Sequence, residues 1–210
     1  MIEDSQVEDA LSILKKEKEK AMKKGKEYSL MKYIRIKSMV SQVTDPKDKE
    51  LRTACNGFFR IRQRSEKFYD EYYKYMLRCK KDKELTFEKV LKHLYEKVEK
   101  VEASFASKLL SLINPDMPVY DSIVINNLKT YEKIDIKTAW HSDYKKRIKR
   151  RVAAYEQIRD WYDNLLKPAR KKKWIELFDK SFPEFKDKIS DVKKIDLILW
   201  KIRPLVKATI

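Results

Sequence analysis

The chain has 210 residues, 42% hydrophobic and 40% charged, with a formal net charge of +17. A chain of this length buries roughly 70% of the surface that it exposes when unfolded, so its hydrophobic fraction predicts a packed core instead of disorder. The sequence contains only two glycines, Gly25 and Gly57, which argues against a glycine-rich phosphate loop and against a β fold with many turns. An all-α fold is the expectation.

The amino-terminal half is predicted to form successive helices with short breaks between them. Residues 6 to about 24 carry apolar side chains at helical spacing, and a second helix follows Gly25. Asp45-Pro46 marks a stop and a restart, because proline is tolerated in the first turn of a helix. Thr86 is predicted to cap a further helix.

The carboxy-terminal half is predicted to hold the most buried helix and the longest one. Residues 103 to 113 carry a broad apolar stripe, which is typical of a central helix. The pattern from about residue 135 to residue 166 predicts the longest helix. Pro168 is expected to begin the next helix, and Ser190 or Asp191 to cap the last one.

These patterns predict eight to ten helices, with Pro204 ending the last of them. We expect a single domain over residues 1–210, built as two helical lobes that flank a cleft. One lobe would comprise about residues 1–85 with the carboxy-terminal helices, and the other about residues 86–166. Four tryptophans are assigned to the core: Trp140, Trp161, Trp174 and Trp200.

The cysteines and histidines do not form a metal-binding pattern. Cys55 and Cys79 lie in predicted helices without a Cys or His at ligand spacing, and His93 and His141 are far apart. The first ten residues are acidic and polar, unlike a signal peptide, and no apolar run approaches membrane-spanning length. We expect a soluble cytoplasmic monomer without a metal or another cofactor, in a reducing compartment.

Positive charge is concentrated between Lys145 and Lys173, where twelve Lys and Arg accompany three Asp and Glu. Such a density predicts a polyanionic partner, with nucleic acid first and an anionic membrane surface second. A lysine-rich solvated exterior without a partner is the alternative explanation.

A single carboxylate, Asp121, follows a stiff loop in the stretch "FASKLLSLINPDMPVYDSIV", residues 105 to 124. The loop contains Pro115 and Pro118, and the next helix is expected to begin at Ser122. Asp is a favoured N-cap residue, so capping alone would explain this position. Capping is also compatible with catalysis, because a carboxylate has two oxygens.

The segment "EASFASKLLSLINPDMPVYDSIV" resembles the core of the helix-hairpin-helix DNA glycosylase superfamily. That core comprises a hairpin, a buried helix with an alanine near the place of Ala106, a proline-containing loop and an aspartate. The superfamily's Asp-Thr-x-Val is similar to Asp121-Ser122-Ile123-Val124 here. The resemblance covers about 25 residues closely, and "NGFFRIRQR" and "DVKKIDLILW" also look like segments of a mostly uncharacterised, divergent bacterial branch of this superfamily.

Three departures from the superfamily pattern affect what the resemblance implies. Val101-Glu102-Ala103 stands where the hairpin normally has Gly-x-Gly, and one additional residue separates Pro118 from Asp121. The lysine that bifunctional members use to form a Schiff base would fall near Ser104. The resemblance therefore implies a monofunctional glycosylase that leaves an abasic site without cutting the strand.

The implied chemistry needs one carboxylate. Loss of a base from deoxyribose develops positive charge on the sugar, which an ionised Asp121 would stabilise while it orients water. The target would be a damaged or modified base, a hypermodified phage base among the candidates, in DNA repair or phage defence. Such a base must be flipped out of a duplex, or presented on a single strand, to reach the site.

Base flipping requires an aromatic-lined pocket and cationic contacts to phosphates. The pocket candidates are Asn56, Phe58, Phe59 and Tyr120. The DNA-binding candidates are Arg60, Arg62, Arg64, Lys100, Ser104, Lys108, Lys146, Lys149 and Arg150. A plain helix junction packed by Phe58 and Phe59 is an equally good interpretation of the first group.

Two other functions remain open at this point. The chain is alternatively a non-catalytic DNA- or RNA-binding protein that keeps a glycosylase-like fold. A third hypothesis is a helical protein that binds acidic protein partners or membrane surfaces.

Overall fold

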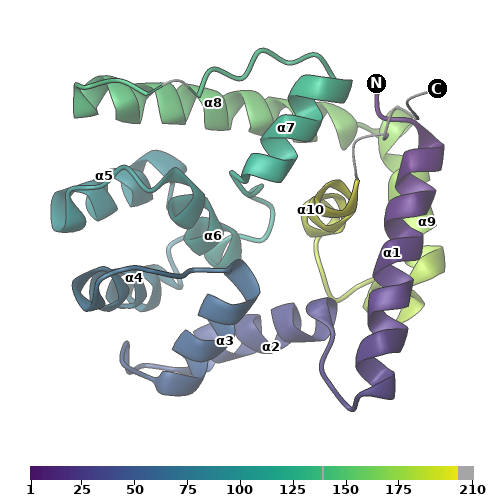
Figure 1. Ribbon diagram of the computed structural model, residues 1–210, viewed down its shortest axis with the longest axis horizontal. Coiled ribbons are helices and arrows are strands. Elements are labelled where there is room, and N and C mark those ends of the chain that lie inside the picture. Colours follow the sequence, from purple (N-terminus) through teal and green to yellow (C-terminus); the bar gives the residue numbers. More distant parts are fainter. Residues whose placement is uncertain (139, 203–210) are drawn as a thin grey trace, which may run out of the picture.

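The computed structural model describes residues 1–138 and 140–202, without the side chains of residues 168–172. Within this part of the chain it contains ten α-helices, one 3₁₀ turn and no strand, so the predicted all-α class is confirmed (Figure 1). The helices are α1 (Asp4–Lys23), α2 (Ser29–Gln42), α3 (Lys49–Phe59), α4 (Glu66–Cys79), α5 (Phe87–Val98), α6 (Ala103–Ile113), α7 (Ser122–Tyr131), α8 (Tyr144–Leu165), α9 (Pro168–Ser181) and α10 (Asp191–Lys201).

Helix α10 lies near the middle of the molecule, where it packs against α1, α7 and α9 (Figure 1). On the other side, α6 packs against α4 and α5, and α5 in turn contacts α8. Buried residues from α1 through α10 form one continuous hydrophobic cluster. Segments distant in the sequence are thus brought together around α10 and α6.

Local capping explains several helix boundaries. Thr86 Oγ1 accepts a hydrogen bond from the Lys89 backbone amide at 3.2 Å, and Ser190 Oγ accepts one from Lys193 at 3.2 Å. The cap at Thr86 and the start of α9 at Pro168 were predicted from the sequence, and Ser190 is one of the two cap residues predicted for α10. The predicted end of the last helix at Pro204 lies outside the described residues.

The prediction was wrong about the start of the longest helix. Helix α8 begins at Tyr144, where the Asp143 carboxylate accepts a hydrogen bond from the Lys145 amide at 2.8 Å. Arg151 of α8 donates a hydrogen bond at 2.8 Å to the carbonyl of Thr138, which lies in the segment before the helix. Arg150 contacts the Trp140 carbonyl at 3.4 Å. Arginines of α8 therefore bind backbone carbonyls that a longer helix would have satisfied internally.

The tryptophans do not share one environment. Trp174 is buried, whereas Trp161 and Trp200 are partly buried at the edge of the core. Trp140 is 71% exposed, so its assignment to the core was wrong. Trp140 and Tyr144 are four residues apart, as residues on one face of a helix are, but the segment before α8 is not helical.

No helix among the described residues is both long and apolar enough to cross a membrane.

Candidate functional site

Asp121 ends the loop between α6 and α7 and is the N-cap of α7. Its side chain is largely buried, and Oδ1 accepts a hydrogen bond from the Ile123 backbone amide at 2.9 Å. The capping role considered from the sequence is therefore present in the structure. Oδ2 lies 3.8 Å from the Nζ atom of Lys108.

The loop that carries Asp121 is held by side chains from three parts of the fold. Ser107 Oγ accepts a hydrogen bond from the Tyr120 amide at 2.8 Å. Tyr155 donates one to the Pro118 carbonyl at 3.0 Å, and Ser190 donates one to the Pro115 carbonyl at 2.6 Å. These buried or partly buried bonds fix the backbone on which the carboxylate stands.

Lys108 projects from α6 and is buried. Its ammonium donates a hydrogen bond to the carbonyl of Phe59 at 3.1 Å in addition to the longer contact with Asp121. Burial lowers the pKa of Lys108, while the Asp121 carboxylate acts in the opposite direction. Lys108 was predicted from the sequence as a DNA-binding residue, and the structure places it inside the protein.

A second buried pair lies on α10. Lys193 Nζ is 3.6 Å from Asp196 Oδ2, a distance too long for a good hydrogen bond. The other carboxylate oxygen, Oδ1, accepts a hydrogen bond from the Tyr162 hydroxyl at 2.5 Å. Burial lowers the pKa of Lys193 and raises the pKa of Asp196, because both charged forms lose hydration.

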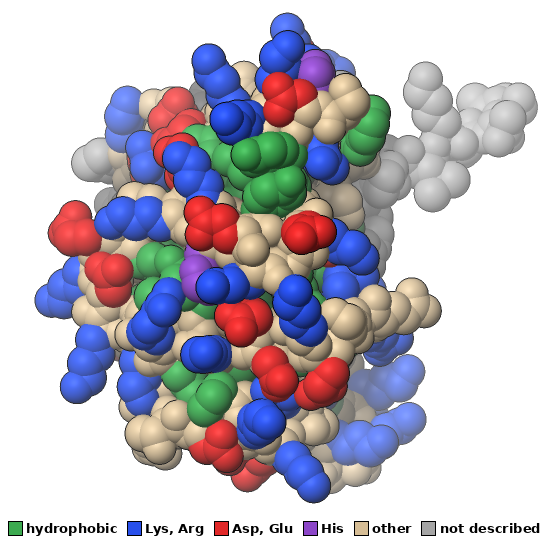
Figure 2. Space-filling model, turned by 90° about the vertical axis from the view of Figure 1, so that its left-hand side faces the viewer, with side chains coloured by type: hydrophobic (Ala, Val, Ile, Leu, Met, Phe, Trp, Pro, Cys, Tyr) green, Lys and Arg blue, Asp and Glu red, His purple; other side chains and the backbone are tan. Residues whose placement is uncertain are grey.

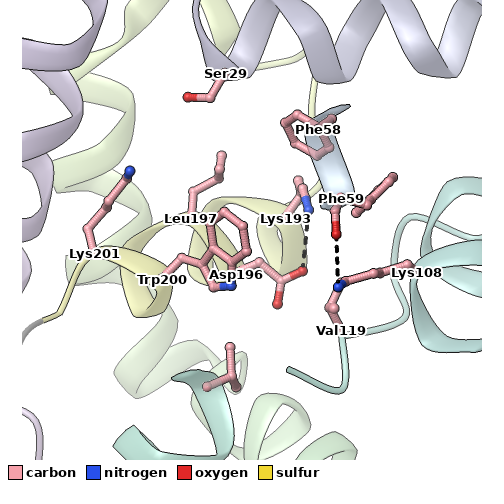
Figure 3. A pocket seen from close by; sticks show the side chains of 11 residues that line it. Ser29, Phe58, Phe59, Lys108, Val119, Lys193, Asp196, Leu197, Trp200 and Lys201 are labelled. Carbon is pink, nitrogen blue, oxygen red and sulfur yellow. Dashed lines mark hydrogen bonds and ion pairs between the residues drawn. The ribbon is translucent and has the colours of Figure 1, made fainter. Parts of the chain in front are cut away.

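Lys108, Lys193 and Asp196 line a narrow, mostly apolar pocket between α3, α6, α7 and α10 (Figure 3). Its volume, open mouth included, is ≈ 540 Å³. Its lining is Ser29, Phe58, Phe59, Lys108, Val119, Val124, Lys193, Asp196, Leu197, Trp200 and Lys201. The pocket thus combines aromatic walls with buried amines and a carboxylate.

Asp121 itself faces a different, more open hollow of ≈ 1020 Å³. This hollow is lined by residues 101–104 around the start of α6, by residues of α7, and by Arg151 of α8. Tyr120 contributes its side chain here, and its hydroxyl accepts a hydrogen bond from Arg151 at 3.0 Å. Asp121 therefore lines one cavity while its ion-pair partner Lys108 lines the other.

The structure divides the predicted pocket residues between these sites. Phe58 and Phe59 line the narrow pocket, and Tyr120 lines the open hollow together with Ser104. Asn56 lines neither cavity. Its side-chain oxygen instead accepts a hydrogen bond from Tyr73 on α4 at 2.8 Å.

The three predicted arginines lie in the loop after α3. Arg60 and Arg62 are exposed, and the guanidinium of Arg60 stands 5.5 Å from the ring centroid of Trp200 at the narrow pocket. Arg64 is partly buried, with an ion pair to Glu102 at 3.2 Å. This pairing leaves Arg64 less available for a phosphate than the other two.

The remaining basic candidates are exposed. Lys100 lies in the segment between α5 and α6, and Lys146, Lys149 and Arg150 lie on α8, where Lys149 also lines the groove toward α5. Figure 2 shows that basic side chains on one face of the molecule are interspersed with acidic ones around an apolar hollow. That hollow corresponds to a groove between α5 and α8, where Tyr95 and Ile148 are among the lining residues.

Sequence reasoning missed the contribution of α10 to the pocket. Lys193 and Asp196 are two of the four charged residues in the stretch "DVKKIDLILW". Their spacing of three places them on one face of a helix, and that face is buried. Charged side chains on the apolar face of a helix are the signal that would have identified them.

Within the described chain, no group of three or more His, Cys, Asp or Glu side chains is arranged to hold a metal ion. No protein-family model, curated protein or solved structure matches the chain. The interpretation of the site therefore depends on its own geometry and chemistry.

Proposed function

We propose that the protein is a monofunctional DNA glycosylase that removes a damaged or modified base. The observation that carries the proposal is the position of Asp121, a carboxylate on a firmly held loop at an open hollow, one ion pair away from an aromatic pocket. A flipped base would occupy the aromatic pocket while its sugar stands near Asp121. The resemblance of residues 102–124 to glycosylase cores supports the same assignment.

Each side chain would have a defined part in base release. The bond between the sugar C1′ and the base nitrogen breaks, and the base takes the bonding electrons. Asp121 Oδ2, the oxygen that does not cap α7, would face the positive charge left on the sugar. Water then adds to C1′ and loses a proton, which leaves an abasic site. Lys108 would position the carboxylate through their 3.8 Å contact.

The DNA would approach along the open hollow. Lys129 and Arg151 line it, and the exposed Lys146, Lys149 and Arg150 on α8 extend the positive charge. In this proposal the protein works as a cytoplasmic monomer. Contacts of this kind make binding strongly salt-dependent.

Base release by the wild type and by Asp121→Asn is the direct test. Both proteins would be incubated with duplex and single-stranded DNA that carries a panel of lesions, and with phage DNA that contains modified cytosine. Abasic sites would be scored by alkaline cleavage. Asparagine is also a good N-cap residue, so the variant should fold normally and bind DNA but release no base.

Asp48→Asn is a matched control, because Asp48 caps α3 through the Leu51 amide at 2.7 Å. It should leave base release unchanged. Equal release by wild type and Asp121→Asn would refute the catalytic role of Asp121.

One observation favours a non-catalytic nucleic-acid-binding protein as the second candidate. Ile123 and Lys108 between them engage both oxygens of Asp121, which is the pattern of a structural carboxylate. Absence of base release from every substrate, with tight salt-sensitive DNA binding by both proteins, would support this candidate.

A further inference from the structure

The proposed base release leaves the Lys193–Asp196 pair without a role. Both residues come from one face of α10, both are buried, and both line the narrow pocket. Figure 3 shows their polar ends directed toward each other at the pocket wall. A buried amine and carboxyl that line a cavity are costly to keep unless they stabilise the fold or act on a ligand.

Aromatic rings enclose the amine of Lys193. Its Nζ atom lies 4.7 Å from the ring centroid of Tyr33, 5.8 Å from that of Phe58 and 5.9 Å from that of Phe59. The side chain of Lys193 is buried, although it lines the narrow pocket. Burial is the main reason for the lowered pKa of Lys193, although Asp196 and Asp121 both act against it. The neutral, nucleophilic form of the amine is therefore more accessible than in a surface lysine.

The two oxygens of the Asp196 carboxyl group have different surroundings. Its Oδ1 atom is held by the Tyr162 hydroxyl at 2.5 Å. Oδ2 is buried without a hydrogen-bond partner in the part of the chain that the structure describes, and it stands 3.6 Å from Lys193 Nζ. Burial raises the pKa of Asp196, although Lys193, the Tyr162 hydroxyl and the Val119 backbone amide act in the opposite direction, so this carboxyl group can hold a proton next to the amine.

The geometry points to a carbonyl-capturing site in which Lys193 forms an imine with an aldehyde carried by a flat ring. Asp196 acts as the proton donor and acceptor for this step. The ring lies between the aromatic and aliphatic walls formed by Phe58, Val119 and Trp200. The ring of such a ligand would pack against the apolar walls, and its aldehyde would meet the polar groups of Lys193 and Asp196.

The step balances without an oxidant or a reductant. The lone pair of the Lys193 amine attacks the carbonyl carbon, and the oxygen takes the proton of Asp196 as the C=O π bond opens. The nitrogen then returns a proton to the Asp196 carboxylate, which yields a carbinolamine. Asp196 protonates the hydroxyl, water leaves, and the nitrogen lone pair forms the C=N bond. Loss of the remaining N–H proton to Asp196 restores the acid.

Two sources provide this ligand chemistry. One is a free aromatic aldehyde, and the other is a formyl-bearing base in DNA. The second source rests on the proposed function, because the base reaches the pocket only by flipping out of the strand. The first source does not depend on DNA at all.

Reductive trapping at neutral pH tests the inference. The wild type is treated with substoichiometric benzaldehyde and cyanoborohydride, and the modified lysine is located by peptide mass spectrometry. In a second arm, an oligonucleotide with 5-formyluracil replaces the aldehyde. We expect the adduct at Lys193 and not at its neighbour Lys194, which is paired with Asp179 at 2.8 Å. Adducts spread over surface lysines, or confined to Lys108, would overturn the inference.

Two variants sharpen the result. Asp196→Asn keeps the shape of the side chain and should slow trapping roughly 100-fold, because the acid is lost. Asp179→Asn, on α9, changes the ion pair of the neighbouring buried Lys194 and should leave the trapping rate unchanged. Equal rates in wild type and Asp196→Asn would refute the role of Asp196. The wild-type mapping stands even if a variant folds poorly.

The trapping assay is separable from base release. Asp121→Asn should trap benzaldehyde at Lys193 at least as fast as the wild type, because the Asp121 charge favours the protonated amine, even though this variant releases no base. Trapping of benzaldehyde without trapping of the oligonucleotide would retain the carbonyl site and remove DNA as its source. Base release without any trapping would retain the glycosylase and refute the carbonyl site.

Discussion

Lys193 and Lys194 are consecutive residues of α10, both buried, yet they have different surroundings. Lys194 Nζ lies 2.8 Å from Asp179 and 3.3 Å from Asp191. Lys193 faces aromatic rings and the Asp196 carboxylate at 3.6 Å. The close ion pairs of Lys194 are those expected of a buried lysine that stabilises the fold. The longer Lys193–Asp196 contact beside a cavity leaves polar atoms that can bind a ligand.

The comparison predicts that the two carboxylates differ in their contribution to stability. Asp179→Asn removes the shorter partner of a buried ammonium and should lower the free energy of unfolding by about 3 kcal/mol. Asp196→Asn should cost only about 1 kcal/mol, since a neutral amide replaces a carboxyl whose protonated form burial already favours. Urea unfolding of both variants measures the difference. Equal losses would show that both pairs are structural.

The hydrogen bond from Tyr162 to Asp196 offers a finer test. Tyr162→Phe should lower the free energy of unfolding by about 1.5 kcal/mol, because a buried acceptor loses its donor. Tyr155→Phe is the matched control, since Tyr155 is also buried and donates to the Pro118 carbonyl at 3.0 Å. Both should lose similar stability in urea, but only Tyr162→Phe should slow benzaldehyde trapping. A slower reaction in both variants would indicate a general loosening of the pocket.

Beyond α10, the tryptophans provide a similar contrast between a structural and an available side chain. Trp174 is buried, whereas Trp140 is 71% exposed with the Arg147 guanidinium 5.7 Å from its ring centroid. Trp140→Ala should weaken single-stranded DNA binding about tenfold through lost base stacking, with little change in thermal stability. Met22→Ala, an exposed position on α1, should change neither quantity. Fluorescence anisotropy with a labelled oligonucleotide measures the affinity, and unchanged binding by Trp140→Ala would exclude Trp140 from the interface.

His93 tests the effect of burial on a titratable group away from the pocket. It stacks on Tyr75 with ring centroids 3.7 Å apart, and burial lowers the pKa of His93, helped by Arg78 and Lys97. Below about pH 6.5 the unfolded chain then binds more protons than the folded chain, so stability falls as the pH is lowered through this range.

His93→Gln should reduce the small loss of folding stability at low pH. The change in urea midpoint between about pH 7 and pH 5 would be compared between the variant and the wild type. An identical change in both proteins would show that His93 does not contribute to it.

Some features of this protein follow from short stretches of sequence. The caps at Thr86 and Ser190 and the start of α9 at Pro168 were predicted because each depends on a few adjacent residues. The N-cap at Asp121 belongs to the same class, since the Ile123 amide that it binds is two residues away. The start of α8 was missed because Trp140 and Tyr144 have helical spacing by coincidence, while long-range bonds from Arg150 and Arg151 hold the preceding loop.

The sequence by itself determined the all-α class, most helix boundaries and the position of one carboxylate after a stiff loop, because periodicity and capping are local properties. Only the tertiary structure decided that Lys108 lies inside the protein against Asp121, and that Lys193 and Asp196 share a pocket with Phe58 and Phe59. A helical pattern shows which residues lie on one face, but the packing of the helices determines what that face meets.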